Sequence, residues 1–181
     1  MSEPIIKTFI NAWTRWGGTW ERWENPIAAR LALLRYLQDQ HRMEILSWQV
    51  ELLPIPGLAA ALNDAGFKLF PPDRRRLNPD LAMGLTAADA ALADNGSVIL
   101  VPAQGRSWLP ALIPIGHVIL LPVNRIYADM AAWRGDWRRT RADESLRTLI
   151  ITGPSFSDDI ERHKHFGMFG PRRTHIILFD V

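Results

Sequence analysis

Short apolar runs of strand length alternate with segments of helical periodicity along this chain, and no other feature constrains its fold as strongly. Such strand–helix repeats favour a parallel or mostly parallel sheet with helices on both faces. The sequence therefore predicts a Rossmann-like α/β fold. The expected strands are residues 19–23, 43–48, 67–70, 97–101, 117–121, 148–151 and 175–179. The expected helices are 5–16, 26–40, 57–65, 86–93, 125–134 with an extension over 137–146, and 157–165.

The length of 181 residues suits one domain over residues 1–181. The sequence contains no internal repeat, no low-complexity tract and no linker long enough to divide it. The alternative is a semi-separate N-terminal lobe over residues 1–80, followed by a core over residues 81–181 that carries the sequence motifs described below.

Composition excludes several classes of protein. The net charge is only +2, and the basic residues are dispersed among acids, so we expect no nucleic-acid partner. No apolar run approaches the roughly 20 residues of a membrane span, and the start of the sequence does not resemble a secretory signal, so a cytoplasmic protein is expected. The absence of cysteine excludes a thiolate nucleophile and a cysteine-ligated iron–sulfur cluster in this chain.

Eight tryptophans are many for this length, and four of them lie within the first 25 residues. One interpretation is that these rings fill core gaps and cover helix edges. The other is that they form a surface for a partner or for a second copy of the chain, because exposed aromatic side chains anchor interfaces.

Two corners of the sequence pair a glycine with a small hydroxyl residue beside an apolar run, at 84–86 and at 152–155. Thr86–Asp89 and Ser155–Asp158 resemble capping boxes, in which a hydroxyl accepts from a backbone N–H of the first helical turn. The same N–H groups are alternatively free to bind a ligand anion. We expect the two corners to converge on a shared pocket.

Ligands of open α/β sheets bind where loops leave the carboxyl ends of the strands. Four loops qualify here: 49–54, 102–108, 122–125 and 152–157. Their hydroxyls, amides and arginines predict a site for a carboxylate or phosphate, unless Arg106 and Arg125 pair with acidic side chains instead. The candidate binding residues of these loops and corners are Gly84, Thr86, Asp89, Gly96, Ser97, Gln104, Gly105, Arg106, Asn124, Arg125, Thr152, Gly153 and Ser155.

Two further residues are candidates for catalysis. Asp94 is a carboxylate in the sequence Asp-Asn-Gly, which turn formation alone also explains. His117 opens an apolar strand, where a hydrogen-bonded core histidine is the alternative. The two histidines at 163 and 165 lack a recognisable third ligand, so neither a metal nor another cofactor is predicted. No serine-hydrolase elbow, P-loop or dinucleotide fingerprint is present.

From Leu53 onward the chain resembles the LUD-domain family, a group that includes bacterial lactate-utilization proteins. The first motif reads Gly-Leu-Thr-Ala-Ala-Asp-Ala-Ala-Leu-Ala-Asp-Asn-Gly-Ser, and a second reads Thr-Gly-Pro-Ser-Phe-Ser-Asp-Asp-Ile-Glu. Asn95 replaces the usual threonine of the family pattern, and Phe169 replaces the usual histidine. The four matching motifs are Gly84–Ser97, Ile113–Val118, Thr152–Glu161 and Gly167–Pro171.

The resemblance implies a fold related to the sugar-phosphate isomerase and CoA-transferase superfamily. It also implies an accessory or ligand-binding subunit that works beside the iron–sulfur subunits of a bacterial L-lactate oxidation system. Since this chain has no cysteine, such a redox centre would lie in a partner. One alternative is a free-standing enzyme acting on a small carboxylate, phosphosugar or acyl-CoA, because Ala93–Gly96 is similar to a CoA-transferase motif and Asp94 would be its nucleophile. The other is a non-catalytic interaction module.

Overall fold

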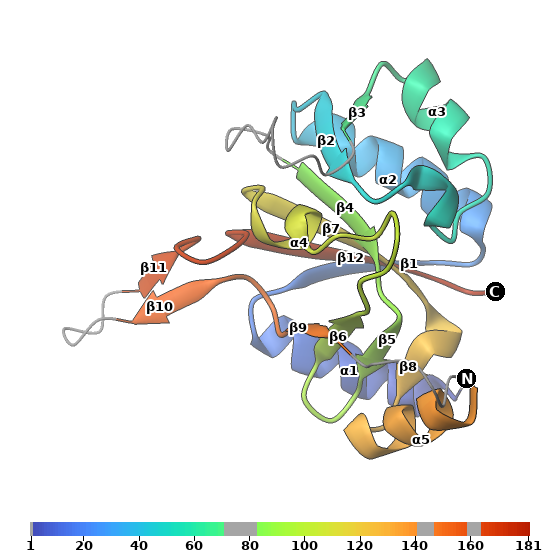
Figure 1. The fold of residues 1–181 in the computed structure, drawn as a ribbon, viewed down its shortest axis with the longest axis vertical. Coiled ribbons are helices and arrows are strands. Elements are labelled where there is room, and N and C mark those ends of the chain that lie inside the picture. The colour runs from blue at the N-terminus through green and yellow to red at the C-terminus, as the bar shows by residue number, and fades with distance from the viewer. Residues whose placement is uncertain (1, 71–82, 141–146, 159–163) are drawn as a thin grey trace.

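Six parallel strands form a continuous sheet at the centre of the molecule (Figure 1). The computed structural model describes residues 2–70, 83–140, 147–158 and 164–181. Every neighbouring pair in this sheet is parallel, which confirms the predicted α/β fold. From one edge to the other the strands are β1 (Thr19–Trp23), β12 (Arg173–Phe179), β7 (Gly116–Pro122), β4 (Met83–Ala87), β2 (Glu44–Ser47) and β3 (Lys68–Phe70).

The central strands are apolar because both of their faces are covered. All seven residues of β7 are buried, and so are all residues of β12 after Arg173. Strands buried on two faces read as continuous apolar runs rather than as alternating patterns. This explains why 117–121 and 175–179 were recognisable as strands in the sequence.

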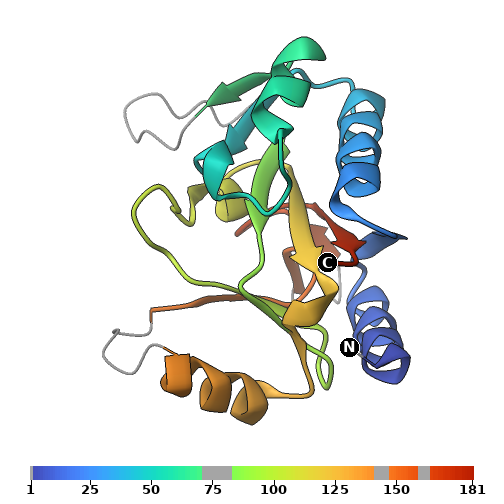
Figure 2. The same cartoon turned by 90° about the vertical axis from the view of Figure 1, so that its right-hand side faces the viewer.

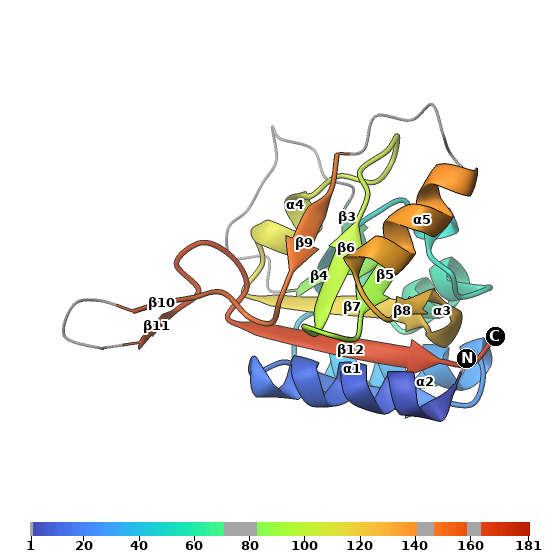
Figure 3. The same ribbon diagram turned by 90° about the horizontal axis from the view of Figure 1, so that it is seen from below.

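Helices cover both faces of the sheet. Figure 3 shows α1 (Glu3–Arg15) and α2 (Pro26–Asp39) on one side of β12, and the short helix α4 (Leu109–Leu112) on the other. Phe9 and Trp13 of α1 are fully buried. A further helix, α3 (Leu58–Asp64), contacts α2 and the 3-10 turn η1 (Val50–Leu52). Among the described residues, no helix combines the length and the apolar character that crossing a bilayer requires.

The start of α2 follows from its sequence. The side-chain Oδ1 of Asn25 accepts hydrogen bonds from the backbone N–H groups of Ile27 at 3.0 Å and Ala28 at 2.9 Å. Pro26 occupies the first helical position, where its missing N–H has no intrahelical partner to lose. The predicted N-cap is confirmed.

A smaller sheet packs beside the main one, with a core of its own. It consists of β8 (Ile126–Tyr127), β5 (Ala90–Leu92), β6 (Ser97–Leu100) and β9 (Leu149–Ile151), in that order. Helix α5 (Met130–Thr140) covers it through the buried Trp133. Figures 1 and 2 both show α5 and α3 at opposite ends of the molecule. Strands β1, β2 and β3, from the first 80 residues, nevertheless lie in the same sheet as β4, β7 and β12.

The predicted helix over residues 86–93 is wrong. Strand β4 continues through Ala87, and β5 begins at Ala90 and pairs with β6 and β8. This segment is rich in alanine, the best helix former, but its alanines are buried by surrounding strands, and tertiary pairing overrides their propensity. Thr86 and Asp89 therefore do not cap a helix.

The predicted helix over residues 157–165 is also wrong where the structure describes it. Strand β10 (Phe156–Asp158) pairs antiparallel with β11 (Lys164–Phe166), and residues 159–163 lie outside the described residues. The rings of Phe156 and Phe166 contact each other across this pair, with centroids 6.3 Å apart. Ser155 precedes a strand and does not cap a helix; its Oγ accepts from the backbone N–H of Phe169 at 3.2 Å.

The helix predicted from residue 125 begins later. Residues 126–127 pair with β5 as strand β8, and α5 starts at Met130. The side-chain Oδ1 of Asp129 accepts from the backbone N–H of Ala132 at 2.8 Å, which fixes this start. The predicted extension is confirmed through Thr140, and residues 141–146 lie outside the described part of the chain.

Candidate functional site

The carboxyl ends of β2, β4 and β7 form the edge of the sheet where a ligand site is expected. Along the chain, β2 leads through α3 to β3, which lies at the edge of the sheet next to β2. Strand β4 lies on the other side of β2, and the chain continues from it to β7, farther from that edge. The chain therefore leaves β2 and β4 in opposite directions, and open α/β sheets bind ligands in the crevice at such a switch point.

A hollow of about 130 Å³ lies at this switch point, and we call it the carboxyl-edge pocket. Its lining combines apolar side chains with two arginines and one carboxylate. The loop 49–54 contributes, as expected, but Trp48 at the end of β2 was not predicted. The lining residues are Trp48, Leu52, Pro54, Ala87, Ala88, Asp89, Arg106, Pro122 and Arg125.

Asp89 and Arg106 form an ion pair in the wall of this pocket. The Oδ2 atom of Asp89 accepts a hydrogen bond from Nη2 of Arg106 and another from the backbone N–H of Val101 at 2.7 Å. The guanidinium carbon of Arg106 lies 4.2 Å from the centroid of the Trp48 ring, a cation–π contact. Both charged side chains are mostly buried, so each one holds the other in place.

The loop that carries Arg106 is tied to the end of β2. The backbone N–H of Gln49 donates to the carbonyl of Gly105 at 3.0 Å, and Nε1 of Trp48 donates to the carbonyl of Ser107 at 2.8 Å. Gly105 has φ of +76°, and a Cβ there would lie 2.5 Å from Oε1 of Gln49. Glycine therefore fits both the backbone conformation and the close approach. Gln104 is exposed and does not line the pocket.

Arg125 gives the pocket its excess positive charge. It ends the 3-10 turn η2 (Val123–Arg125) that follows β7, and it is exposed. Among the described residues its guanidinium forms no hydrogen bond or ion pair, in contrast to that of Arg106, although its charge acts on the carboxylate of Asp136. Two arginines against one carboxylate leave the lining with a net charge suited to a small anion, and a guanidinium binds a carboxylate through paired N–H donors.

Thr86 and His117 lie in the sheet and do not line the pocket. The Oγ1 atom of Thr86 and Nε2 of His117 are 2.8 Å apart, and both residues are buried. Burial lowers the pKa of His117 to about 3, so its imidazole is neutral at physiological pH. The backbone of Gly84, beside them in β4, packs directly under Pro110 of α4. These three residues therefore hold the sheet and α4 together.

The second sequence corner lies against the C-terminal end of α1. The hydroxyls of Ser97 and Thr152 are 2.7 Å apart. A Cβ on Gly153 would lie 2.8 Å from the carbonyl oxygen of Trp16, and one on Gly96 would lie 2.6 Å from the backbone nitrogen of Trp13. None of these residues lines the carboxyl-edge pocket, so the corners at 84–86 and 152–155 do not share it.

Asp94 and Asn124 also lie outside the carboxyl-edge pocket. Asp94 is an exposed residue in the turn between β5 and β6, and its backbone N–H donates to the carbonyl of Ala128 at 3.0 Å. The acyl-transfer alternative depends on Asp94 as nucleophile and stays a prediction, since Asp94 lines none of the hollows described for residues 2–70, 83–140, 147–158 and 164–181. In the described part of the chain, no three His, Asp or Glu side chains gather as metal ligands would.

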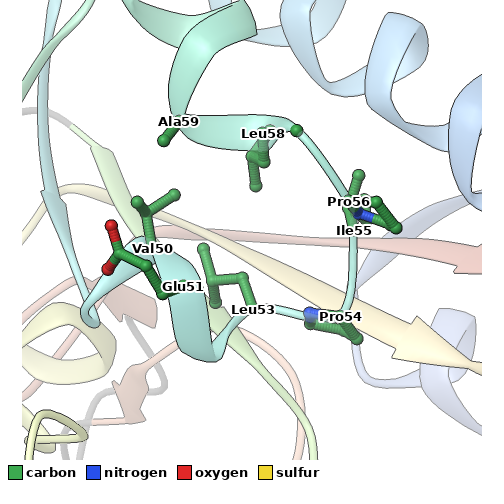
Figure 4. A pocket seen from close by; sticks show the side chains of 9 residues that line it. Val50, Glu51, Leu53, Pro54, Ile55, Pro56, Leu58 and Ala59 are labelled. Carbon is green, nitrogen blue, oxygen red and sulfur yellow. The ribbon is translucent and has the colours of Figure 1, made fainter.

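A larger hollow, of about 480 Å³, opens over residues 50–59 between η1 and the start of α3 (Figure 4). Glu51 is the single charged residue of its lining, which otherwise consists of Val50, Leu53, Pro54, Ile55, Pro56, Gly57, Leu58 and Ala59. A specific site needs convergent polar groups as well as apolar walls. The smaller pocket is therefore the better candidate.

Comparison with known proteins shows similarity to one family over a large part of the chain. The model of the LUD domain matches residues 59–179. Lactate utilization protein C of Shouchella clausii is 30% identical over 100 residues, which cover 54% of this chain and 44% of that protein. Lactate utilization protein C of Anoxybacillus flavithermus is 29% identical over 129 residues, covering 68% and 58% respectively. The chain thus spans about half the length of these curated relatives.

The fold is also that of a solved structure. A crystal structure of a DUF162 family protein from Deinococcus radiodurans aligns with a TM-score of 0.68 over 99% of both chains, at 16% sequence identity. At this identity the match shows a shared fold. Because the LUD-domain model matches residues 59–179, well over half of the sequence, this chain belongs to the LUD-domain family.

Proposed function

We propose that this chain binds a small carboxylate of the lactate class in the carboxyl-edge pocket, as an accessory component of a lactate-utilization system. The family supports the pathway, since curated relatives are named lactate utilization protein C. The observation that carries the site is that two arginines, Arg106 and Arg125, line the pocket at the switch point with a single carboxylate, that of Asp89. At about 130 Å³ the pocket is smaller than the roughly 300 Å³ or more of drug-sized sites, which favours a ligand of few atoms.

Replacing Arg125 with alanine should weaken the binding of L-lactate by about 10- to 100-fold, because hydrogen bonds to a charged group are worth about 1.5–3 kcal/mol. Isothermal titration calorimetry of both proteins at constant ionic strength measures this change. Arg138→Ala, which removes an exposed arginine of α5 that does not line the pocket, is the matched control and should bind as the parent protein does. Equal lactate affinity of Arg125→Ala and the control would refute the site.

A lactate-oxidising system also needs a redox centre, and we propose that partner subunits supply it. Oxidation of lactate to pyruvate removes two electrons, and this chain has no cysteine to hold an iron–sulfur cluster. Its role in such an assembly would be to bind the carboxylate beside a partner that accepts the electrons.

The β10–β11 hairpin is the surface that we assign to this partner. It projects from the body of the molecule (Figure 3) and presents the exposed rings of Phe156 and Phe166. The exposed Met168 and Phe169 follow it in sequence, and Phe169 is 77% exposed. Together with Trp16, the two hairpin rings line a hollow of about 270 Å³. Contiguous exposed apolar groups of this kind mark interaction surfaces.

Co-expression with the iron–sulfur subunits of the lactate-utilization system of the same organism should yield a complex that elutes as one species in size-exclusion chromatography. Phe169→Ser should weaken this complex without lowering the melting temperature, because its side chain is largely exposed. Separate elution of the proteins at high concentration would contradict the proposed partnership, and an unaffected complex with Phe169→Ser would remove the hairpin from it.

A further inference from the structure

We propose that Asp89 makes the carboxyl-edge pocket select 2-hydroxy acids over the corresponding 2-oxo acids. This inference rests on the proposed function and names the group that would bind the oxygen on the second carbon of the ligand. It identifies Asp89 as a specificity-determining residue, in addition to its ion pair with Arg106.

The two carboxylate oxygens of Asp89 are used unequally. Oδ2 accepts both of its hydrogen bonds, from Val101 and from Arg106. Oδ1 accepts none from the described residues, and it is not among the buried side-chain atoms that lack a partner. Asp89 lines the pocket, and the proposal takes Oδ1 as the acceptor that it offers to a ligand there.

The hydrogen-bonding capacity of the ligand follows from its oxidation state. A 2-hydroxy acid carries an O–H donor beside its carboxylate, whereas the ketone oxygen of a 2-oxo acid can only accept. A free carboxylate oxygen therefore forms a hydrogen bond with the first ligand and repels the lone pairs of the second. Sites built to bind a substrate hydroxyl reject analogues that lack the donor, since a buried polar group is then left without a partner.

The carboxylate of such a ligand also needs a cation within reach. Arg125 lines the same hollow of about 130 Å³, so the carboxylate and the neighbouring hydroxyl can meet Arg125 and Asp89 together. The reverse arrangement, with the ligand carboxylate on Asp89, would place like charges in contact. The electrostatics therefore fix the orientation of the bound acid.

Asp89 is held in position before any ligand binds. Val101 and Arg106 fix its Oδ2, and the guanidinium of Arg106 lies against the ring of Trp48. That ring is held in turn by its hydrogen bond to Ser107. An acceptor fixed in this way discriminates between ligands without losing side-chain entropy when the ligand binds.

The test compares L-lactate, pyruvate and propionate as ligands of the parent protein by calorimetry at constant ionic strength. Propionate carries the carboxylate without an oxygen on the second carbon and serves as the reference. We expect L-lactate to bind at least about 10-fold more tightly than pyruvate, with propionate between them, since one hydrogen bond to a charged group is worth that factor or more. Lactate and pyruvate affinities within about twofold overturn the role of Asp89, and no saturable binding of any of the three acids overturns the proposed function itself.

A variant locates the selectivity. In Asp89→Asn the amide can both donate and accept, so the ratio of lactate to pyruvate affinity should fall to near one. The exposed residue Asp39 of α2 provides the matched control, and Asp39→Asn should keep the parental ratio. A loss of folding in Asp89→Asn would lower both affinities together, and the comparison of ligands in the parent protein does not depend on this variant. An unchanged ratio in folded Asp89→Asn, checked by circular dichroism, refutes the assignment.

Discussion

Gly84→Ala should strongly destabilise the fold of this chain. A Cβ at position 84 would lie 1.8 Å from the carbonyl oxygen of Pro110 and 2.8 Å from its carbonyl carbon. These are backbone atoms of α4, and the glycine itself is paired on both sides, with Leu46 of β2 and His117 of β7. Neither side can move without breaking the sheet or lifting the helix. We expect a loss of about 3 kcal/mol or more, a large share of the roughly 5–15 kcal/mol of a typical domain.

Urea unfolding followed by circular dichroism measures this loss. Gly135→Ala is the matched control, because apart from its two chain neighbours and the nearby backbone of α5, no heavy atom of the described structure lies within 4 Å of a Cβ added there. Since Gly135 lies within α5, alanine should stabilise the protein by about 0.5–1 kcal/mol. A parental urea midpoint for Gly84→Ala would show that α4 does not pack on β4 as described.

Acidification should destabilise the protein through His117. Burial lowers its pKa from the ordinary 6.5 to about 3, so between these two values the unfolded chain binds a proton that the folded chain does not. The stability associated with the neutral imidazole is fully present above about pH 6.5 and is lost as the pH falls toward 3. Each pH unit in this window costs up to about 1.4 kcal/mol, and the whole window about 4–5 kcal/mol.

The contribution of His117 is measured as a difference between two proteins. Burial also lowers the pKa of His175, against the opposing effect of Glu21, so other groups add to the acid sensitivity of the parent. His117→Gln is neutral throughout this range, and its free energy of unfolding should fall less steeply between pH 6.5 and 4 than that of the parent. Parallel pH profiles would mean that His117 is protonated in the folded state or is not buried.

Much of the main sheet could be predicted because several of its strands are short apolar segments of the sequence. Residues 117–121 and 175–179 were recognised for this reason, and residues 19–23 by their alternating pattern; all three segments pair in the sheet. The alanine-rich segment from the end of β4 through β5 misled the prediction, because alanine favours a helix by propensity. What decides between them is the pairing with β6 and β8, which no local pattern contains.

Part of the candidate site was predictable for the same kind of reason. Arg125 follows the apolar strand β7 of the main sheet, and Arg106 lies in the loop after the apolar strand β6 of the smaller sheet. Asp89 was a candidate through its sequence motif, and all three residues line the carboxyl-edge pocket. The sequence analysis also placed Thr152 and Gly153 in the same site. Whether they reach it depends on where the smaller sheet packs, and the sequence does not contain that information. Trp48 could have been predicted as a residue of the site, because it directly follows a strand that ends at the same edge of the sheet.

The position of β12 between β1 and β7 has a consequence for how the chain folds during synthesis. Thr19 and its partner His175 are 156 residues apart in sequence, and the described strands place nothing else between β1 and β7. Strand β1 therefore has no partner in the sheet until β12 has been synthesised and enters between β1 and β7. Closure of such distant pairs is slow because the loop entropy must be overcome first, so the edges of β1 and β7 stay unpaired in partly folded chains.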